Sequence, residues 1–386
     1  MTASFGELLR ERRLAAGLSM GQLAKLVHYS KGYLSKIENG LKPPNTAFAR
    51  QCDSVLGAGG ELIAAASRPA PTRRQVLVAG TMLGVGALTG NAPSPELTFR
   101  MRDRFEHLQG LGLRMSPRAI LEPLKELQYK VDATARKDGS TALLRLAARI
   151  AEYTGWMSQE AGDDQNALWW TRHASELSRA AGDPEIACYA LVREAGLALY
   201  RQQAAETINL AQQAQWIGRA GARTLALAAR REAQGHALAG DRYAAESAFE
   251  RAAELMQDAP RDDRAYPLLG SSVPDPLELA RGWSLCDLGR NAEAADLLDR
   301  QLTLLPARSQ RSRARFGARR SLAHVLAGEV DEGCRTLAAT LADAEQVDSA
   351  TIRTDLRQLA RTLGRWHNHG PVREVYPDLR RLLAHR

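Results

Sequence analysis

The sequence of 386 residues is poor in the residues and segments that define several protein classes. It holds four cysteines that stand far apart, with no CxxC pair and no Cys/His spacing typical of a metal site. Its longest apolar run has about 13 residues, whereas a membrane-spanning helix needs about 20. These absences argue against a disulfide-bonded scaffold, a zinc finger and a spanning protein. We expect reduced, buried thiols at Cys52, Cys188, Cys286 and Cys334.

Motifs that carry catalysis are also missing. The sequence has no phosphate-binding glycine loop, no HExxH and no nucleophile elbow, and His367 and His369 form an isolated pair near the C-terminus. We therefore expect no enzyme, and no catalytic residue, metal ligand or cofactor.

What is present fits an intracellular, multidomain regulator. A hydrophobic content of 45% can fill the cores of two or three domains. Lysine and arginine total 52 against 44 acidic residues, for a net charge of +8, which suits a polyanionic partner. Because arginine far outnumbers lysine, as coding bias alone can produce, the charge is supporting evidence only.

Two short amphipathic helices are predicted close together near the N-terminus. Ser19 and Gln22 form a capping box, and Ser30 can cap a second helix. Apolar residues recur at spacings of three and four in both helices, so each helix turns one stripe inward. That stripe comprises Met20, Leu23, Ala24, Val27, Leu34 and Ile37, and neighbouring helices add Phe5, Leu8, Leu9, Phe48, Cys52, Val55 and Leu56 to the same core.

The opposite face of the second helix is small or cationic and suits a DNA major groove. At these residues the chain resembles the XRE family of helix-turn-helix regulators, which includes the lambda-type repressors. The resemblance covers roughly the first 65 residues. Ala24 matches the family's small residue, Glu38-Asn39-Gly40 its helix end, and Arg13 the buried ion-pair partner of Glu38.

The resemblance implies a five-helix domain that binds double-stranded DNA. It places base reading on Lys31, Gly32 and Lys36, with Tyr33 near the backbone or a thymine methyl. Because Gly32 has no side chain, direct readout rests on the two lysines, which can donate to guanine O6 and N7. The alternative is that the lysines form a solvated helix face. The DNA-binding residues expected are Ser19, Ser30, Lys31, Gly32, Tyr33, Ser35, Lys36, Asn39 and Lys42.

Residues 68–98 differ in composition from both flanks. A basic, proline-rich stretch precedes an apolar run with three glycines, and Asn91 to Pro95 is again rich in breakers. Segment 72–89 also resembles a twin-arginine export signal, but export would carry the DNA-binding domain out of the cell. We expect a domain linker that contains a packing helix, no membrane association, and a cytoplasmic protein.

From Thr98 onward the pattern is helical, and turns recur roughly 40 residues apart. The turns are predicted at Gly162, Gly240, Gly289 and Gly328, with a degenerate one near Gln202, and a Pro/Asp/Gly-rich loop is inserted from Asp258 to Pro276. The chain resembles a tetratricopeptide repeat from about 140 to 386, which implies an α-solenoid of helix pairs. We expect Trp156, Trp170, Trp283 and Trp366 to anchor the core, the alternative being a ligand contact.

Four arginines recur at spacings of three and four with no acid between Pro306 and His324. Arg308, Arg311, Arg315 and Arg319 thus make one cationic stripe along a predicted helix. Their mutual repulsion is unfavourable unless negative charge lies nearby. That charge comes either from acidic residues of the protein or from an anionic effector, a peptide carboxylate or DNA phosphate. They are candidate effector-binding or anion-binding residues.

The expected fold is all-α. We divide the chain into a helix-turn-helix domain at 1–67, a linker at 68–98 and a sensor and dimerisation solenoid at 99–386. The arrangement resembles regulators of Gram-positive bacteria, including actinobacterial groups, some of which are receptors for short signalling peptides. That resemblance implies a homodimeric transcription regulator with a peptide, small molecule or protein effector in the solenoid groove. The alternative is a scaffold that binds a partner protein and touches DNA weakly.

Overall fold

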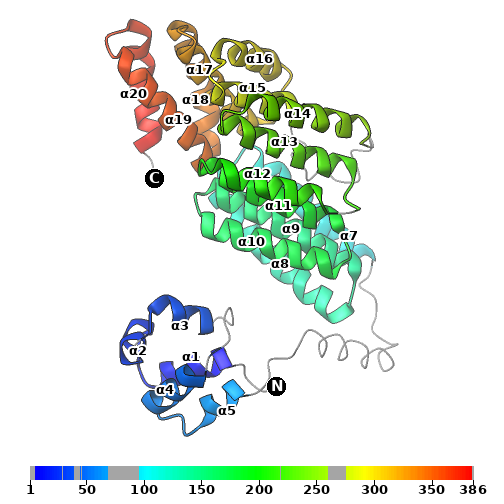
Figure 1. The fold of residues 1–386 in the computed structure, drawn as a ribbon, viewed down its shortest axis with the longest axis vertical. Helices are drawn as coiled ribbons and strands as arrows, with labels where there is room; N and C mark the ends of the chain where they lie inside the picture. The colour runs from blue at the N-terminus through cyan, green and yellow to red at the C-terminus, as the bar shows by residue number, and fades with distance from the viewer. Residues whose placement is uncertain are drawn as a thin grey trace. The chain divides into compact units, whose positions relative to one another are not determined.

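A computed structural model describes residues 5–67, 95–259 and 275–384, except residues 28, 39–43, 45 and 218. The chain forms two compact units, residues 1–90 and 91–386. Every regular element in the described ranges is a helix, so the all-α prediction is confirmed (Figure 1). The division between the units falls within the segment expected to be a linker, most of which lies outside the described residues.

In its described residues, which end at Ser67, the first unit has five helices around one small core. Its helices are α1 (Phe5–Ala15), α2 (Met20–Leu26), α3 (Lys31–Glu38), α4 (Thr46–Leu56) and α5 (Glu61–Ser67). The apolar stripes of α2 and α3 meet α1 and α4, as the spacing predicts, and Leu9, Leu23, Leu34 and Phe48 are fully buried. Val55 is the exception, because it lies on the solvent side of α4 and is 37% exposed.

The second unit stacks helices one after another in sequence order (Figure 1). Antiparallel pairs are formed by α9 with α10, α11 with α12, α13 with α14, α15 with α16, and α17 with α18. This is the α-solenoid of helix pairs expected from the periodicity. Its elements are α7 (Pro95–Gly112), α8 (Pro117–Asp138), α9 (Thr141–Glu160), α10 (Asp164–Ala180), α11 (Pro184–Tyr200), α12 (Ala204–Gln215), α13 (Ala222–Leu238), α14 (Arg242–Gln257), α15 (Pro276–Asp287), α16 (Asn291–Thr303), α17 (Gln310–Leu326), α18 (Val330–Val347), α19 (Ala350–Leu363), the 3-10 turn η1 (Gly364–Trp366) and α20 (Gly370–Ala384).

The helix pairs turn where the sequence predicts, and the turns share one backbone conformation. Gly162, Gly240, Gly289 and Gly328 all have φ values from 75° to 91°, in the left-handed region that favours glycine. Gln202 takes the same conformation at the degenerate turn, with φ of 59°. The following helix begins two residues after each of these positions, so each pair is closed by a very short connection.

Helices far apart in the sequence also meet inside the second unit. The N–H of Arg311, at the start of α17, donates to the carbonyl of Leu113, just after α7, at 2.9 Å. Helix α19 contacts α9 as well. A simple solenoid has contacts only between neighbouring repeats, whereas here the first and later helices are joined.

The tryptophans do not all anchor the core. Trp283 is buried, and Trp156 and Trp170 are partly buried, but Trp366 lies on the 3-10 turn with 43% of its surface exposed. The prediction of a core role is therefore wrong for Trp366. No helix in the described ranges is both long and apolar enough to span a membrane.

Candidate functional site

Two capped helices set the geometry of the N-terminal unit. The Ser19 hydroxyl accepts from the Gln22 N–H at 3.3 Å, and the Gln22 side chain accepts from the Ser19 N–H at 2.8 Å. This confirms the capping box at the start of α2. The Ser30 hydroxyl accepts from the Tyr33 N–H at 3.2 Å and caps α3 in a similar way. The caps fix where α3 begins, and so which of its residues face outward.

A buried ion pair locks α3 against α1. The Arg13 Nε and Nη2 atoms donate to the two carboxylate oxygens of Glu38 at 2.6 and 2.9 Å, and both side chains are buried. Such a bidentate pair fixes distance and orientation together. The helices also approach closely at Gly6, where an added Cβ would lie 2.5 Å from the Ile37 carbonyl oxygen. The pairing implied by the family resemblance is therefore present.

The outward face of α3 is open at its first turn. Lys31 and Gly32 are exposed, and no atom of the described residues lies within 4 Å of where a Cβ on Gly32 would be. Ser35 is half-buried. Lys36 lies on α3, but its side chain is outside the description, and Asn39 and Lys42 are outside the described residues altogether. An open, cationic first turn is what docking into a major groove requires.

Tyr33 has a packing role that the sequence did not reveal. Its ring stacks on Tyr29 with centroids 5.0 Å apart and meets Phe48 edge-on at 5.3 Å. The ring is therefore part of the junction between α3 and α4. Asp53 was also missed, although its buried carboxylate accepts from the N–H groups of Gly60 and Leu62 at 2.8 and 2.9 Å and holds α5 on the core.

The arginine stripe of α17 does not form a single site. Arg308 is exposed, just before the helix, whereas Arg311 and Arg319 are buried. Arg319 Nη2 lies 2.7 Å from Asp355 Oδ1 in an ion pair, and the guanidinium lies over the Trp283 ring at 3.9 Å. Acidic residues from other helices thus neutralise most of the positive charge of the stripe. Acidic residues of the protein were one of the two sources of negative charge expected from the sequence.

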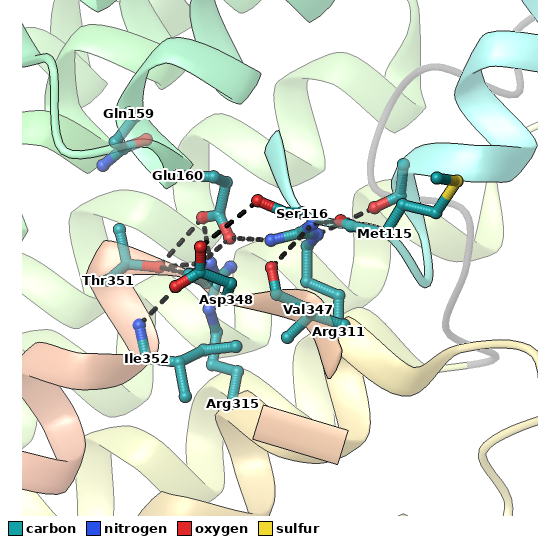
Figure 2. Close-up of polar contacts among 12 residues, drawn as sticks. Met115, Ser116, Gln159, Glu160, Arg311, Arg315, Val347, Asp348, Thr351 and Ile352 are labelled. Atoms are coloured by element: carbon teal, nitrogen blue, oxygen red, sulfur yellow. Dashed lines mark hydrogen bonds and ion pairs between the residues drawn. The ribbon is translucent and has the colours of Figure 1, made fainter. Parts of the chain in front are cut away.

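Glu160 is the carboxylate that pairs with two arginines of the stripe. Its fully buried carboxylate accepts from Arg311 Nη1 at 2.8 Å, from Arg315, and from the hydroxyls of Ser349 and Thr351 at 2.8 and 2.9 Å (Figure 2). Burial alone would raise the pKa of Glu160, but the charges of Arg315 and Arg311 and the two hydroxyl hydrogen bonds lower it to about 2.

Arg311 extends this cluster to the end of α7. Its Nε donates to the Gly112 carbonyl at 2.8 Å, and its Nη2 donates to the carbonyls of Met115 and Val347 (Figure 2). One guanidinium therefore joins α17 to the end of α9, to the α7–α8 turn and to the α18–α19 turn. This explains how helices distant in the sequence are held together.

A cavity of about 690 Å³ lies beside this cluster, bounded by α7 and by α9, α11, α13 and α17. Drug-sized ligand pockets have volumes of about 300–1,000 Å³. Trp156, Tyr153, Tyr189 and Phe316 give it apolar walls, and Glu106 and Glu152 are its acidic lining residues. The lining arginines are Arg114, Arg193, Arg230, Arg231, Arg308, Arg311 and Arg315.

Several of these arginines lack a carboxylate partner within the described part of the chain. Arg230 has no hydrogen-bond or ion-pair partner there, and Arg231 donates only to the Gln234 side chain, at 2.8 Å. Arg193 lies 3.5 Å from Glu152. Desolvation, together with the positive charge of Arg193, lowers the pKa values of Arg230 and Arg231. The cavity wall therefore carries positive charge that the protein itself does not neutralise.

One group in the described ranges has donors suited to a metal ion, namely Asp299, His324 and Glu332. Its carboxylates already face arginines, because Arg320 lies 3.6 Å from Asp299 and Arg335 pairs with Glu332. His324 contacts both Asp299 and Glu329. We interpret the group as an ion-pair cluster that joins α16, α17 and α18.

Comparisons with known proteins identify a domain within the first unit. No curated protein matches the chain. Among solved structures, the complex of Bacillus thuringiensis PlcR with the peptide PapR7 and DNA is similar with a TM-score of 0.34 and 10% identity, over 99% of this chain and 94% of that one. A family model described as a helix-turn-helix domain matches residues 4–66, so the first unit is a helix-turn-helix domain.

Proposed function

We propose that the protein is a DNA-binding transcription regulator without enzymatic activity. Its first unit reads DNA through α3, and its helical unit binds an effector and a second copy of the chain in the cytoplasm. The carrying observation is the first turn of α3, where Lys31 and Gly32 face outward from a helix fixed by the Arg13–Glu38 pair and by the Ser30 cap. The family-model match over residues 4–66 supports it.

The proposal assigns distinct roles to the residues of the first unit. Lys31 and Lys36 donate to base edges, and the hydroxyls of Ser19 and Ser30, together with Asn39 and Lys42, contact phosphates. A hydroxyl that accepts a capping hydrogen bond still has its own proton to donate. Tyr33 positions α3 through its packing on Phe48, so its contribution to DNA contact is secondary.

Alanine variants of the two lysines test this function. In a dimer, half-sites lie about one DNA turn, roughly 34 Å, apart. Lys31→Ala and Lys36→Ala should each weaken binding to a DNA site that the wild-type protein selects from random or genomic fragments. The expected loss is about 1–3 kcal/mol, the value of one base contact. Lys137→Ala, an exposed lysine at the end of α8, is the matched control and should bind as the wild type does.

The same experiment separates the regulator from a scaffold that only touches DNA. A scaffold would bind every DNA fragment with similar, strongly salt-dependent affinity, and all three lysine variants would weaken it alike. Sedimentation of the free protein and of the DNA complex measures whether two copies bind one site.

A further inference from the structure

Two half-buried arginines of the α7–α17 cavity, Arg230 and Arg231, differ in their pairing from the buried arginines Arg311 and Arg319 of the second unit. Arg311 and Arg319 each meet a buried carboxylate at 2.8 Å or less, from Glu160 and Asp355. Arg230 and Arg231 line the cavity with no carboxylate at that distance in the described part of the protein. Holding a charge partly away from water without a counter-charge is unfavourable, so an opposite charge supplied from outside would be bound favourably.

The position of Arg231 is fixed before any ligand arrives. A Cβ added to Gly196 on α11 would lie 3.2 Å from its Nη2 atom, so the guanidinium passes closely over α11 where a glycine leaves room. Its Nη1 also donates to Gln234. The buried Nε atoms of Arg230 and Arg231 have no hydrogen-bond partner in the described residues. A held guanidinium with unused donors loses little entropy when it binds an anion.

We propose that this cavity binds a small organic anion with at least two negative charges beside an apolar part. Arg230 and Arg231 bind the charged groups, with Arg193 adjacent to them, and the rings of Trp156 and Tyr189 contact the apolar part. Two or more charges are expected because Arg230 and Arg231 both line the cavity without a carboxylate partner in the described residues. Phosphates and carboxylates share this chemistry, and guanidinium groups bind both.

The inference deepens the proposed function, since it names the ligand class of the effector site, but its test involves no DNA. Calorimetry measures binding when the full chain is titrated with pyrophosphate or with citrate, and chloride at equal ionic strength is the reference. The two anions distinguish a phosphate ligand from a carboxylate ligand. Arg230→Gln and Arg231→Gln should each lower the affinity for whichever anion binds by about tenfold, which corresponds to the loss of one charge-assisted hydrogen bond. Arg145→Gln, an exposed arginine on α9, should leave binding unchanged.

Each outcome decides the proposal. Binding of either anion that is lost at Arg230 and Arg231 but kept in Arg145→Gln supports it. It is overturned if neither anion binds better than chloride, or if Arg145→Gln weakens binding as much as the cavity variants do. Thermal unfolding of the free variants guards against misfolding, because removing an unpaired, desolvated charge should not lower the melting temperature. A failure of DNA binding with anion binding intact would overturn the proposed function and not this site.

Discussion

Glu160 shows how one buried carboxylate can hold several helices. It faces two arginines and two hydroxyls from α17 and from the start of α19. Replacing it with glutamine would leave the buried guanidinium of Arg311 without its counter-charge. We predict that Glu160→Gln destabilises the second unit by about 3–5 kcal/mol, as breaking a buried ion pair does.

Urea unfolding followed by circular dichroism measures this loss. The matched control is Glu122→Gln on α8, whose exposed carboxylate pairs with Lys125 and should change stability by about 0.5 kcal/mol or less. Since the pKa of Glu160 is lowered to about 2, its contribution is complete above the ordinary carboxyl pKa and is lost as the pH falls from about 4.5 to about 2. The difference between wild type and Glu160→Gln should shrink over that window, and a difference independent of pH would contradict the assignment.

A second titrating carboxyl, Glu152, lines the α7–α17 cavity. Desolvation raises its pKa to about 7, opposed by the charges of Arg193 and Arg149. As the pH rises through about 7 the carboxyl ionises and adds a negative charge to the wall. We predict that sulfate, whose charge is constant in this range, binds about three- to tenfold more weakly at pH 8 than at pH 6.

Calorimetry of sulfate binding to the Glu152→Gln variant tests this prediction. The pH dependence of the affinity should be mostly lost in that variant. The imidazole of His107 also lines the cavity. His107→Gln is therefore the control, and a pH dependence removed by that variant in place of Glu152→Gln would assign the effect to the imidazole.

Among the helices, the turns show how glycine encodes the repeat. Gly162, Gly240, Gly289 and Gly328 adopt the left-handed conformation between paired helices, and Gln202 does so at the corresponding position of the α11–α12 pair. A left-handed conformation costs an L-residue about 1–2 kcal/mol, whereas glycine costs entropy in the unfolded chain. We predict that Gln202→Gly stabilises the second unit by about 0.5–1 kcal/mol.

The reverse change, Gly240→Gln, should destabilise by about 1 kcal/mol. No atom of the described residues lies within 4 Å of a Cβ at Gly240, so the effect reports backbone conformation alone. Thermal melts of both variants check the pair, and a destabilised Gln202→Gly would show that the glutamine side chain matters more than its backbone.

The success of the sequence in predicting these elements has a physical basis. Helix pairs are encoded locally, by stripes at spacings of three and four and by left-handed turns, so the turns predicted at Gly162, Gly240, Gly289 and Gly328 lie between paired helices in the structure. The capping box at Ser19 is also a local signal, whereas the Arg13–Glu38 pair was implied by the family resemblance. Val55 and Trp366 were misplaced because an apolar residue type alone does not say which side of a helix is covered.

The whole second unit depends on contacts with no local signal. Arg311 and Glu160 are 151 residues apart, and nothing near either residue in the sequence identifies the other as its partner. The stripe of four arginines was recognised, but which ones are neutralised could not be predicted. Nothing in the sequence distinguishes Arg230 and Arg231, the cavity residues without a carboxylate partner in the described part of the chain, because adjacent arginines on a helix usually lie in solvent. Only the superhelical path of the chain brings them to the same cavity as Arg193 and Arg308.

DNA selection tests the central claim of a sequence-specific regulator most directly. Purified full-length protein is incubated with random or genomic fragments at physiological salt and excess competitor, and the retained DNA is sequenced. The account predicts a palindromic motif with half-sites about ten base pairs apart, retained by Lys137→Ala and lost when Lys31 and Lys36 are both replaced by alanine. Enrichment without a motif that disappears as salt is raised, and that is equal in all variants, would contradict it.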